Sequence, residues 1–382
     1  MSSSDTGSDP STLSVFYDPV FLEHRPPDGA FDRPPDDRLA VSEPHPDRPE
    51  RIENIRWMIE RELADHTTWR SVTPASRDQL ERVHDPAYLD SLRDLAAQGG
   101  GRLIATTAVS ERTYDAAEHA AGAAIEAARH AHEYGLGEVP YALVRPSGHH
   151  AQPAQTDGYC YVNNVAVAAA GLIATGRARR VAIVDWDVHP ANGTQECFYD
   201  RDDVLAVSLH NDYGAWGPNH PQENSLAEVG DGTGEGYTVN VPLPPGTGDG
   251  GYTEAFERVV EPVVAEFDPD CLLVSPGQDP GQVPGQVDPN GRNLVTMAGF
   301  RDLGRRVREI AARSDAGLAL VQEGGYGISS LAYDTLGVLC GATGIETDAR
   351  DPFDLLAEYR PPASKWIEDA VEAHGEFWSL KD

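Results

Sequence analysis

The chain has 382 residues, of which 40% are hydrophobic, so it can bury a sizeable core. It carries 62 acidic against 30 basic residues, a formal net charge of -32, and its only lysines are Lys365 and Lys381. Because the chain offers no basic patch to neutralise phosphates, direct binding to nucleic acids is not expected.

The excess of negative charge bears on the medium in which the protein works. Self-repulsion at this charge destabilises a compact state in dilute buffer. At about 1 M salt the Debye length falls to roughly 3 Å, which screens the repulsion. We therefore expect a protein adapted to a high-salt cytoplasm, as in halophilic archaea.

The N-terminus, the apolar runs and the cysteines indicate a soluble cytoplasmic protein. Residues 1–12 are expected to be disordered, and residues 1–14 are too polar for a signal peptide. The longest apolar run, Val165–Ala174, is too short to span a bilayer, so no membrane partner is expected. The cysteines form no CxxC pair and are expected to be buried thiols: Cys160, Cys197, Cys271 and Cys340.

The first part of the chain has little regular pattern. A strand is expected in VFYDPV, within Leu13–Glu23, and it is broken by Pro19. Residues 25–49 are rich in Pro, Asp and Arg and are expected to form an ordered loop or surface arm. Helices are expected at Ile52–His66, Ala87–Ala97 and Thr113–Tyr134.

Farther along the chain, apolar strands alternate with helical segments. The expected strands are Tyr141–Val144, Val181–Asp185, Val204–Leu209, Cys271–Ser275 and Leu318–Gln322. The expected helices are Asn163–Thr175, Thr194–Phe198, Tyr252–Phe267, Met297–Arg313 and Ile328–Thr343. This alternation predicts an α/β fold in which residues 13–382 form a single domain, with one parallel sheet covered by helices on both faces.

Three metal-capable side chains follow the strand Val181–Val184. Asp185, Asp187 and His189 stand at alternate positions, so a strand places them on one face at its carboxyl end. Ligands bind at that end in open α/β sheets, and buried carboxylates packed this closely favour a cation. The alternative is a polar strand end that caps the next helix through Asn192.

Three further segments place polar groups just after apolar strands. They are Arg145–His150 with its paired histidines, the loop of repeated Pro-Gly-Gln that contains Asp279 and Asp288, and Gln322–Tyr326 with two glycines before a tyrosine. Each segment alone is weak evidence, but four polar clusters at one rim of a sheet are much stronger.

Together these groups favour amide hydrolysis. A set of Asp and His ligands without thiolate suits a catalytic rather than a structural zinc. A histidine can take the proton of a water and return it to the leaving group, while a tyrosine hydroxyl donates to the developing oxyanion.

These motifs resemble the zinc-dependent histone deacetylase family, and in particular its class II branch with the bacterial deacetylase-like amidohydrolases. RPSGHH, GYCYVNN, DWDVHPANGTQ, SLH, VNVPLPPGTGDGGY, DPNGR and QEGGY stand in the family's order over roughly Tyr17–Gly344. The resemblance implies the arginase/deacetylase fold, with a central parallel sheet of about eight strands.

The resemblance carries roles onto matching residues. It implies zinc ligands at Asp187, His189 and Asp288, and a structural potassium held by Asp185, Asp187, His189, Ser208 and Leu209. It makes His149 and His150 the tandem histidines, with His150 as general base and acid, and Tyr326 the oxyanion donor. Asp185 and Asn192 would accept hydrogen bonds from His149 and His150, which fixes ring orientation. Gly158, Tyr159 and Trp216 would form the walls of an acyl-lysine tunnel.

The chain departs from the family pattern in two places. Pro190-Ala191 replaces the usual His-Gly after the metal-binding histidine. The Pro-Gly-Gln loop looks longer than the family spacing, which leaves Asp279 and Asp288 as candidates for the third ligand. We choose Asp288, because Asp288–Arg292 best matches the family's DPLGR.

Several functions remain open on this evidence. A deacetylase acting on acetyl-lysine in proteins is the leading hypothesis, and an acetylpolyamine amidohydrolase, favoured by a narrowed tunnel or an occluding homo-oligomer, is the alternative. An arginase-like dimanganese enzyme lacks a needed carboxylate at Ala191. A non-catalytic acyl-lysine binder fits poorly with the retained His149, His150 and Tyr326.

Overall fold

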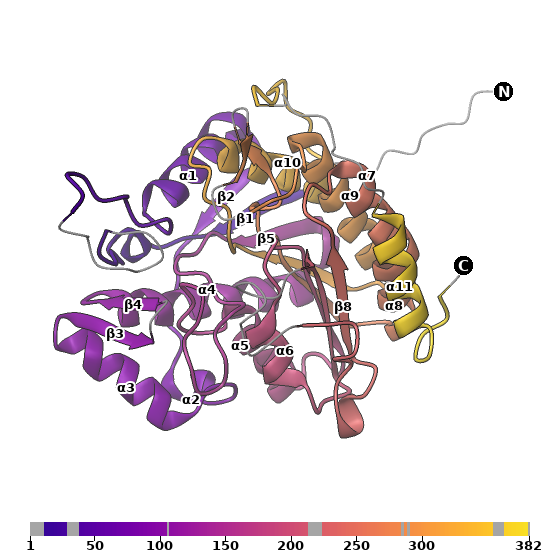
Figure 1. Ribbon diagram of the computed structural model, residues 1–382, viewed down its shortest axis with the longest axis horizontal. Coiled ribbons are helices and arrows are strands. Elements are labelled where there is room, and N and C mark those ends of the chain that lie inside the picture. The colour runs from indigo at the N-terminus through magenta and orange to yellow at the C-terminus, as the bar shows by residue number, and fades with distance from the viewer. Residues whose placement is uncertain are drawn as a thin grey trace.

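The protein is built on one sheet of eight parallel strands. The computed structural model describes residues 11–28, 38–104, 107–212, 224–283, 286–288, 291–353 and 363–380. Within these residues the strand order is β2-β1-β5-β12-β9-β6-β7-β8, and every pairing in this sheet is parallel. Figure 1 shows the sheet running through the centre of the molecule, with helices on either side. The predicted α/β architecture is confirmed.

The elements have the following bounds. The sheet contains β1 Thr12–Phe16, β2 Thr67–Arg70, β5 Glu138–Ala142, β6 Val181–Asp185, β7 Val204–Asn211, β8 Thr238–Leu243, β9 Cys271–Ser275 and β12 Gly317–Val321. Two small hairpins are β3 Gly100–Ile104 with β4 Thr107–Ser110, and β10 Gln282–Val283 with β11 Gln286–Val287. The helices are α1 Glu50–Glu62, α2 Arg77–Leu80, α3 Pro86–Ala97, α4 Thr113–Tyr134, α5 Asn164–Ala174, α6 Asn192–Phe198, α7 Asp249–Ala255, α8 Glu261–Phe267, α9 Met297–Arg313, α10 Ser330–Thr343 and α11 Ser364–His374.

The alternation of side chains along each strand divides the core into two layers. In β6, Ala182 and Val184 face a layer formed with α1, α9 and α10, whereas Val181 and Ile183 face α4 and α5. These residues are all buried, because a parallel strand inside a doubly covered sheet has no solvent face. The near-continuous apolar runs of the sequence follow from this arrangement (Figure 1).

Most predicted elements are found, with differences at the edges of the sheet. The strands Val181–Asp185 and Cys271–Ser275 and the helices Thr113–Tyr134 and Met297–Arg313 have the predicted bounds. The edge strands β2 and β8 were not predicted, nor was α11, whose His374 Nε2 donates to the Asn240 carbonyl of β8 at 2.9 Å. The four cysteines are free thiols, as predicted, but only Cys160, Cys271 and Cys340 are buried, whereas Cys197 is half-buried.

Three predicted segments differ in detail. The strand in VFYDPV ends at Phe16, because Asp18 accepts a hydrogen bond from Val20 N at 2.9 Å and starts a short 3-10 helix, η1 Pro19–Leu22. The disordered tail was drawn too far, since Thr12 already begins β1, while residues 1–10 lie outside the described residues. The Pro-Gly-Gln repeat contains the hairpin β10–β11 rather than loop alone.

Among the described helices, none is both long enough and apolar enough to cross a membrane.

Candidate active site

Four neighbouring strands deliver the polar segments of the site. β5, β12, β9 and β6 lie side by side in the sheet, and the segments that follow them contain the paired histidines, Glu323–Tyr326, Asp279 and the Asp185–His189 stretch. Since all four strands are parallel, their carboxyl ends meet at one rim. The convergence expected from the sequence is therefore present.

Asp187, His189 and Asp279 form a buried cluster of potential metal ligands. One ligand atom from each lies within 4.8 Å of the others. His189 Nδ1 lies 3.1 Å from Asp187 Oδ1 and 3.0 Å from Asp279 Oδ2. The carboxylates of Asp187 and Asp279 repel each other when both are ionised. This repulsion adds to the effect of burial, and together they raise the pKa of Asp279 to about 7.

Backbone N–H groups hold both carboxylates in place. Asp279 Oδ1 accepts from Val188 N at 2.9 Å, and Asp187 Oδ2 accepts from Gly324 N at 2.9 Å. A Cβ atom at Gly277 or Gly324 would lie 2.2 or 2.4 Å from Asp187 Oδ2, so only glycine allows the backbone this close to the cluster. The carboxylate oxygens are thus positioned before any ligand binds.

The paired histidines lie in opposite electrostatic environments. His149 Nδ1 lies 3.0 Å from Asp185 Oδ2, and its Nε2 lies 3.8 Å from Asp187 Oδ1. Burial opposes its charge, but Asp187 and Asp185 prevail and raise the pKa of His149 to about 10. His150 Nδ1 lies 2.5 Å from the neutral Asn192 Oδ1, and burial beside His149 lowers the pKa of His150 to about 3.

Glu323 supports the turn that carries the histidines. Its Oε2 accepts from Gly148 N at 2.8 Å and from His149 N at 3.2 Å. The side chain is fully buried, and burial raises the pKa of its carboxyl to about 8. Glu323 therefore links the segment after β12 to the segment after β5.

Tyr326 reaches the same rim from the segment after β12. Its backbone N–H and that of Gly327 both donate to Asp288 Oδ2 at 2.7 Å. Burial, assisted by Asp279 and Asp187, raises the pKa of Tyr326 well above its ordinary value. The phenol therefore stays protonated and remains a hydrogen-bond donor.

Comparison with known proteins identifies the family. The histone deacetylase domain matches residues 45–341. The chain is 40% identical over 371 residues to histone deacetylase 8 of Arabidopsis thaliana, covering 96% of this chain and 97% of that protein. It is 35% identical over 358 residues to the histone deacetylase-like amidohydrolase of Pseudomonas aeruginosa, covering 91% and 90%. The crystal structure of the HDA15 HD domain superposes with a TM-score of 0.81 at 30% identity, covering 97% of this chain and 96% of that one.

The chain belongs to the histone deacetylase family. Its relatives are named deacetylases and amidohydrolases, which supports a hydrolase with deacetylase activity. The fold predicted from the family's motifs is confirmed by the solved structure.

Within this family framework, the geometry of the rim bears on the choice between Asp279 and Asp288 as the third ligand. Asp288 does not belong to the cluster of Asp187 and His189; Asp279 takes that place. Asp288 Oδ2 instead accepts hydrogen bonds from the backbone N–H groups of Tyr326 and Gly327. We therefore prefer Asp279 to the predicted Asp288 as the third ligand, because the chain turns back toward β6 directly after β9 and brings Asp279 against Val188 and His189.

The remaining predicted residues fall near the rim where they are described. Gly158 and Tyr159 adopt positive φ angles of 50° and 64°, and the Tyr159 ring lies 6.0 Å from that of Tyr326. Ser208 on β7 is the register partner of Asp185, with Leu209 next in the strand. Trp216 lies outside the described residues.

Sequence reasoning missed a buried charge network behind the site. Asp47 Oδ1 accepts from Arg51 Nη1 at 2.6 Å and from Arg145 Nε at 2.9 Å, and all three side chains are buried. Arg145 also donates to the Phe21 and His24 carbonyls at 2.9 and 2.5 Å. The available signal was the run His45–Arg51, whose charges stand at the start of a helix with an apolar face.

Proposed function

We propose that this member of the histone deacetylase family is a zinc-dependent enzyme that removes acetyl groups from lysine ε-amines in proteins. One observation carries the proposal: the buried Asp187–His189–Asp279 cluster lies at the same rim as the two histidines of opposite electrostatic environment. Such opposed environments are typical of groups with acid and base roles.

The cluster fits zinc by its donor chemistry. Two carboxylates and one imidazole, with no thiolate, are the ligand types of catalytic zinc sites. A divalent cation would also offset the repulsion between the carboxylates of Asp187 and Asp279. When bound there, zinc would polarise the amide carbonyl and lower the pKa of a water molecule.

His150 is the proposed base and acid of the reaction. Its neutral imidazole can accept the proton of the attacking water, because Asn192 offers no charge that would hold a proton on the ring. His150 then returns the proton to the amine that leaves. His149, held by Asp185, keeps positive charge beside the reacting atoms.

Tyr326 and the tunnel residues complete the proposed mechanism. The protonated Tyr326 hydroxyl would donate to the carbonyl oxygen as that oxygen gains negative charge. The rings of Tyr159 and Tyr326 offer apolar faces to an aliphatic lysine chain. We also propose that oxygens of Asp185, Asp187, His189, Ser208 and Leu209 would hold a structural potassium ion, since Asp185 on β6 and Ser208 on β7 are register partners.

The test is acetate release by zinc-loaded enzyme in molar KCl, with an acetyl-lysine peptide and an acetylated polyamine compared side by side. We expect turnover of the peptide, and Tyr326→Phe should lower kcat by about 100- to 1,000-fold with little change in KM. Tyr333→Phe, which alters a tyrosine on α10 outside the site, should leave kcat in place.

The two other candidate functions predict different results in the same assay. Preferred turnover of the polyamine would replace the lysine substrate with the polyamine alternative while keeping the chemistry. Tight peptide binding without acetate release from either substrate would contradict the hydrolase and favour the acyl-lysine binder.

A further inference from the structure

The amide of Asn192 lies between two buried groups of the site. Its Oδ1 lies 2.5 Å from His150 Nδ1, and its Nδ2 lies 3.3 Å from Asp157 Oδ2. The side chains of Asp157, Asn192 and His150 are each at most 2% exposed. Asp157 is held at its other oxygen as well, because Oδ1 accepts from Gly158 N at 2.9 Å.

This arrangement decides which end of the amide faces His150. Both oxygens of Asp157 act as acceptors, Oδ1 from Gly158 N and Oδ2 from Asn192 Nδ2, so Asp157 orients the NH₂ end of Asn192 toward itself. The carbonyl end then faces His150, whose Nδ1 must carry the proton, and Nε2 is left with its lone pair. Without the carboxylate of Asp157, the side-chain amide of Asn192 could rotate by 180° and donate through its NH₂ group to Nδ1 of His150. The proton of the imidazole would then lie on Nε2.

We propose that Asp157 is a positioning residue that acts through Asn192 to fix His150 in the tautomer whose Nε2 can accept a proton. The consequence for turnover rests on the proposed hydrolase function. The family resemblance assigned Asn192 to His150 but gave Asp157 no role.

A purely structural role for Asp157 must be separated from this one. Asp157 opens the turn that contains Gly158 and Tyr159, both with positive φ, and its bond to Gly158 N could serve that turn alone. Thr156 offers a matched control, because its Oγ1 donates to the Cys160 carbonyl across the same turn at 2.5 Å.

The first measurement is steady-state kinetics of the zinc-loaded enzyme. Asp157→Asn should lower kcat by roughly 10- to 100-fold with KM for the acetyl-lysine peptide near the wild-type value, as is typical when a partner that orients a ligand or base is lost. Thr156→Val should keep most of the wild-type kcat. Equal losses in the two variants would overturn the proposal in favour of a turn-stabilising role.

The second measurement does not depend on activity. The ¹⁵N shifts of His150 should report a protonated Nδ1 and a bare Nε2 in the wild type, and a mixture of tautomers in Asp157→Asn. An unchanged tautomer in the variant would overturn the proposal. Because the spectra need no turnover, an inactive wild type would refute the hydrolase while leaving this test intact.

A double-mutant cycle adds a rescue. Asn192→Asp gives His150 an acceptor that needs no orientation, so Asp157→Asn should cost no further activity in that background. The same fold-loss in both backgrounds would show that Asp157 does not act through Asn192.

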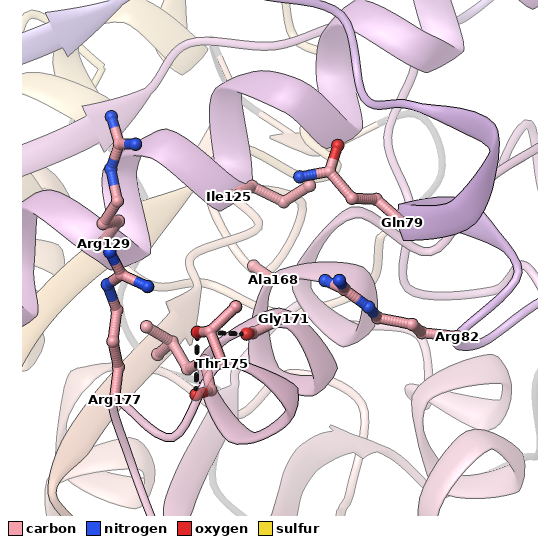
Figure 2. A pocket seen from close by; sticks show the side chains of 9 residues that line it. Gln79, Arg82, Ile125, Arg129, Ala168, Gly171, Thr175 and Arg177 are labelled. Carbon is pink, nitrogen blue, oxygen red and sulfur yellow. Dashed lines mark hydrogen bonds between the residues drawn. The ribbon is translucent and has the colours of Figure 1, made fainter.

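A second, independent observation concerns a small cavity far along α5 from the histidines. It has a volume of about 150 Å³ and lies between α2, α4 and α5, with an apolar lining from Ile125, Ala168 and Leu172. Arg82, Arg129 and Arg177 line it as well. In the view of Figure 2, Arg82 reaches in from one side beside Gln79, and Arg129 and Arg177 stand on the other.

These three guanidinium groups have no counter-charge in the part of the chain that the structure describes. No carboxylate of the described residues lies within ion-pair distance of any of them. By contrast, the single side chain of Arg306 pairs with three carboxylates, those of Asp302, Glu257 and Glu261. They are not needed to cap α5 either. Three of its last four carbonyls already have donors, because Gly171 O accepts from Thr175 Oγ1 at 2.8 Å, Leu172 O from Arg177 N at 3.0 Å and Ile173 O from Gly176 N at 2.9 Å.

We infer that this cavity binds a small oxyanion of the phosphate or sulfate type. The three side chains are exposed at the mouth of the cavity and have no ion-pair partner among the described residues, so their N–H groups are available for charge-assisted hydrogen bonds to a tetrahedral oxyanion. The volume is below the roughly 300–1,000 Å³ of pockets for drug-sized ligands, so it suits a single anionic group.

Calorimetric titration of the full chain with inorganic phosphate, at constant ionic strength in KCl, tests this site. We expect saturable binding that weakens roughly tenfold or more in Arg82→Gln and in Arg177→Gln. Arg61→Gln, which removes an exposed arginine on α1, should bind phosphate as the wild type does. Tighter binding of glycerol phosphate would indicate that the natural ligand is a phosphorylated metabolite rather than the free ion.

Non-specific effects of phosphate have a different signature. Phosphate stabilises proteins in general by exclusion from their surface, and that effect does not saturate. Equal affinities in the wild type and both pocket variants, each shown to be folded by circular dichroism, would overturn the proposal.

Discussion

The guanidinium of Arg51 lies over the ring of Tyr326, with Cζ 4.7 Å from the ring centroid. The same group donates through Nε to the Gly325 carbonyl at 2.5 Å and through Nη2 to the Glu323 carbonyl at 2.8 Å. Asp47 holds its third edge at 2.6 Å. A residue of α1 thus fixes the segment that presents the proposed oxyanion donor.

Arg51→Lys should lower kcat by about 10- to 100-fold with a smaller effect on KM. Lysine keeps the charge but is a point donor, so it cannot hold two carbonyls and a carboxylate in the fork geometry of arginine. The loss then reflects Tyr326 held in the wrong place rather than a lost contact with substrate. Steady-state kinetics on the acetyl-lysine peptide measures the effect.

Arg56→Gln is the matched control for this variant. Arg56 lies on the same helix, but its side chain is exposed and pairs with Glu60 at 2.8 Å. It should retain wild-type kcat. Wild-type kcat in a folded Arg51→Lys enzyme would show that the clamp on the Tyr326 segment does not matter for turnover.

Replacing Asp279 and Asp288 in turn should separate metal binding from the support of Tyr326. Asp279→Asn should weaken zinc binding by more than the 10- to 100-fold typical for an outer partner, because it removes a carboxylate of the cluster itself. Asp288→Asn should keep zinc and lose kcat, because its carboxylate holds the backbone of Tyr326 and Gly327. Metal content after dialysis, measured beside kcat, gives both quantities.

The opposite pattern would restore the ligand set first read from the sequence. Zinc lost from the Asp288 variant and kept by the Asp279 variant would place the third ligand at Asp288. Asp249→Asn provides a control for a general effect of removing carboxylates, because its oxygens bond to Thr296 rather than to the cluster.

The sequence was most informative where chemistry and secondary structure shared one segment. Asp187 and His189 could be placed together because they directly follow the apolar strand Val181–Asp185 at alternate positions. The partners of His149 and His150 came from the family resemblance and agree with the bonds to Asp185 and Asn192.

The features that the sequence left ambiguous or did not reveal depend on contacts between distant segments. The choice between Asp279 and Asp288 depends on the path that the chain takes after β9. The repeated Pro-Gly-Gln sequence has no apolar periodicity from which this path could be predicted. Arg51 donates a hydrogen bond to the backbone carbonyl of Glu323, which lies 272 positions farther along the chain. No local sequence pattern could have paired these two residues. The edge strand β8 was overlooked because TVNVPL contains a proline that interrupts the apolar run.

Lowering the pH should reduce stability through His84. Its Nδ1 lies 3.0 Å from the Gln152 carbonyl, and its Nε2 accepts from Asn163 N at 2.9 Å, so the ring must be neutral. Burial lowers the pKa of His84 to about 4, below the roughly 6.5 of the unfolded chain. Between these values the unfolded chain binds the extra proton, so stability is complete above pH 6.5 and falls by about 3 kcal/mol toward pH 4.

Urea unfolding of His84→Gln at fixed KCl concentration checks this contribution. The variant should be less stable than the wild type at pH 7.5, and the gap should narrow by about 3 kcal/mol as the pH falls to 4. His132→Gln changes an exposed histidine of α4 and should keep the wild-type pH dependence. A constant gap for His84→Gln across this range would contradict the assignment.

The net charge of -32 leads to a prediction about salt. Raising KCl from 0.1 to 1 M shortens the Debye length from about 10 to about 3 Å, so repulsion among surface carboxylates fades while contacts inside the core are unaffected. The Tm should therefore rise steadily over this range. Thermal unfolding with sucrose of equal osmolality separates screening from solute exclusion, because sucrose stabilises without screening charge. A Tm that is flat in KCl, or that rises equally in sucrose, would refute adaptation to high salt, since the folded state would then need no counter-ions to persist.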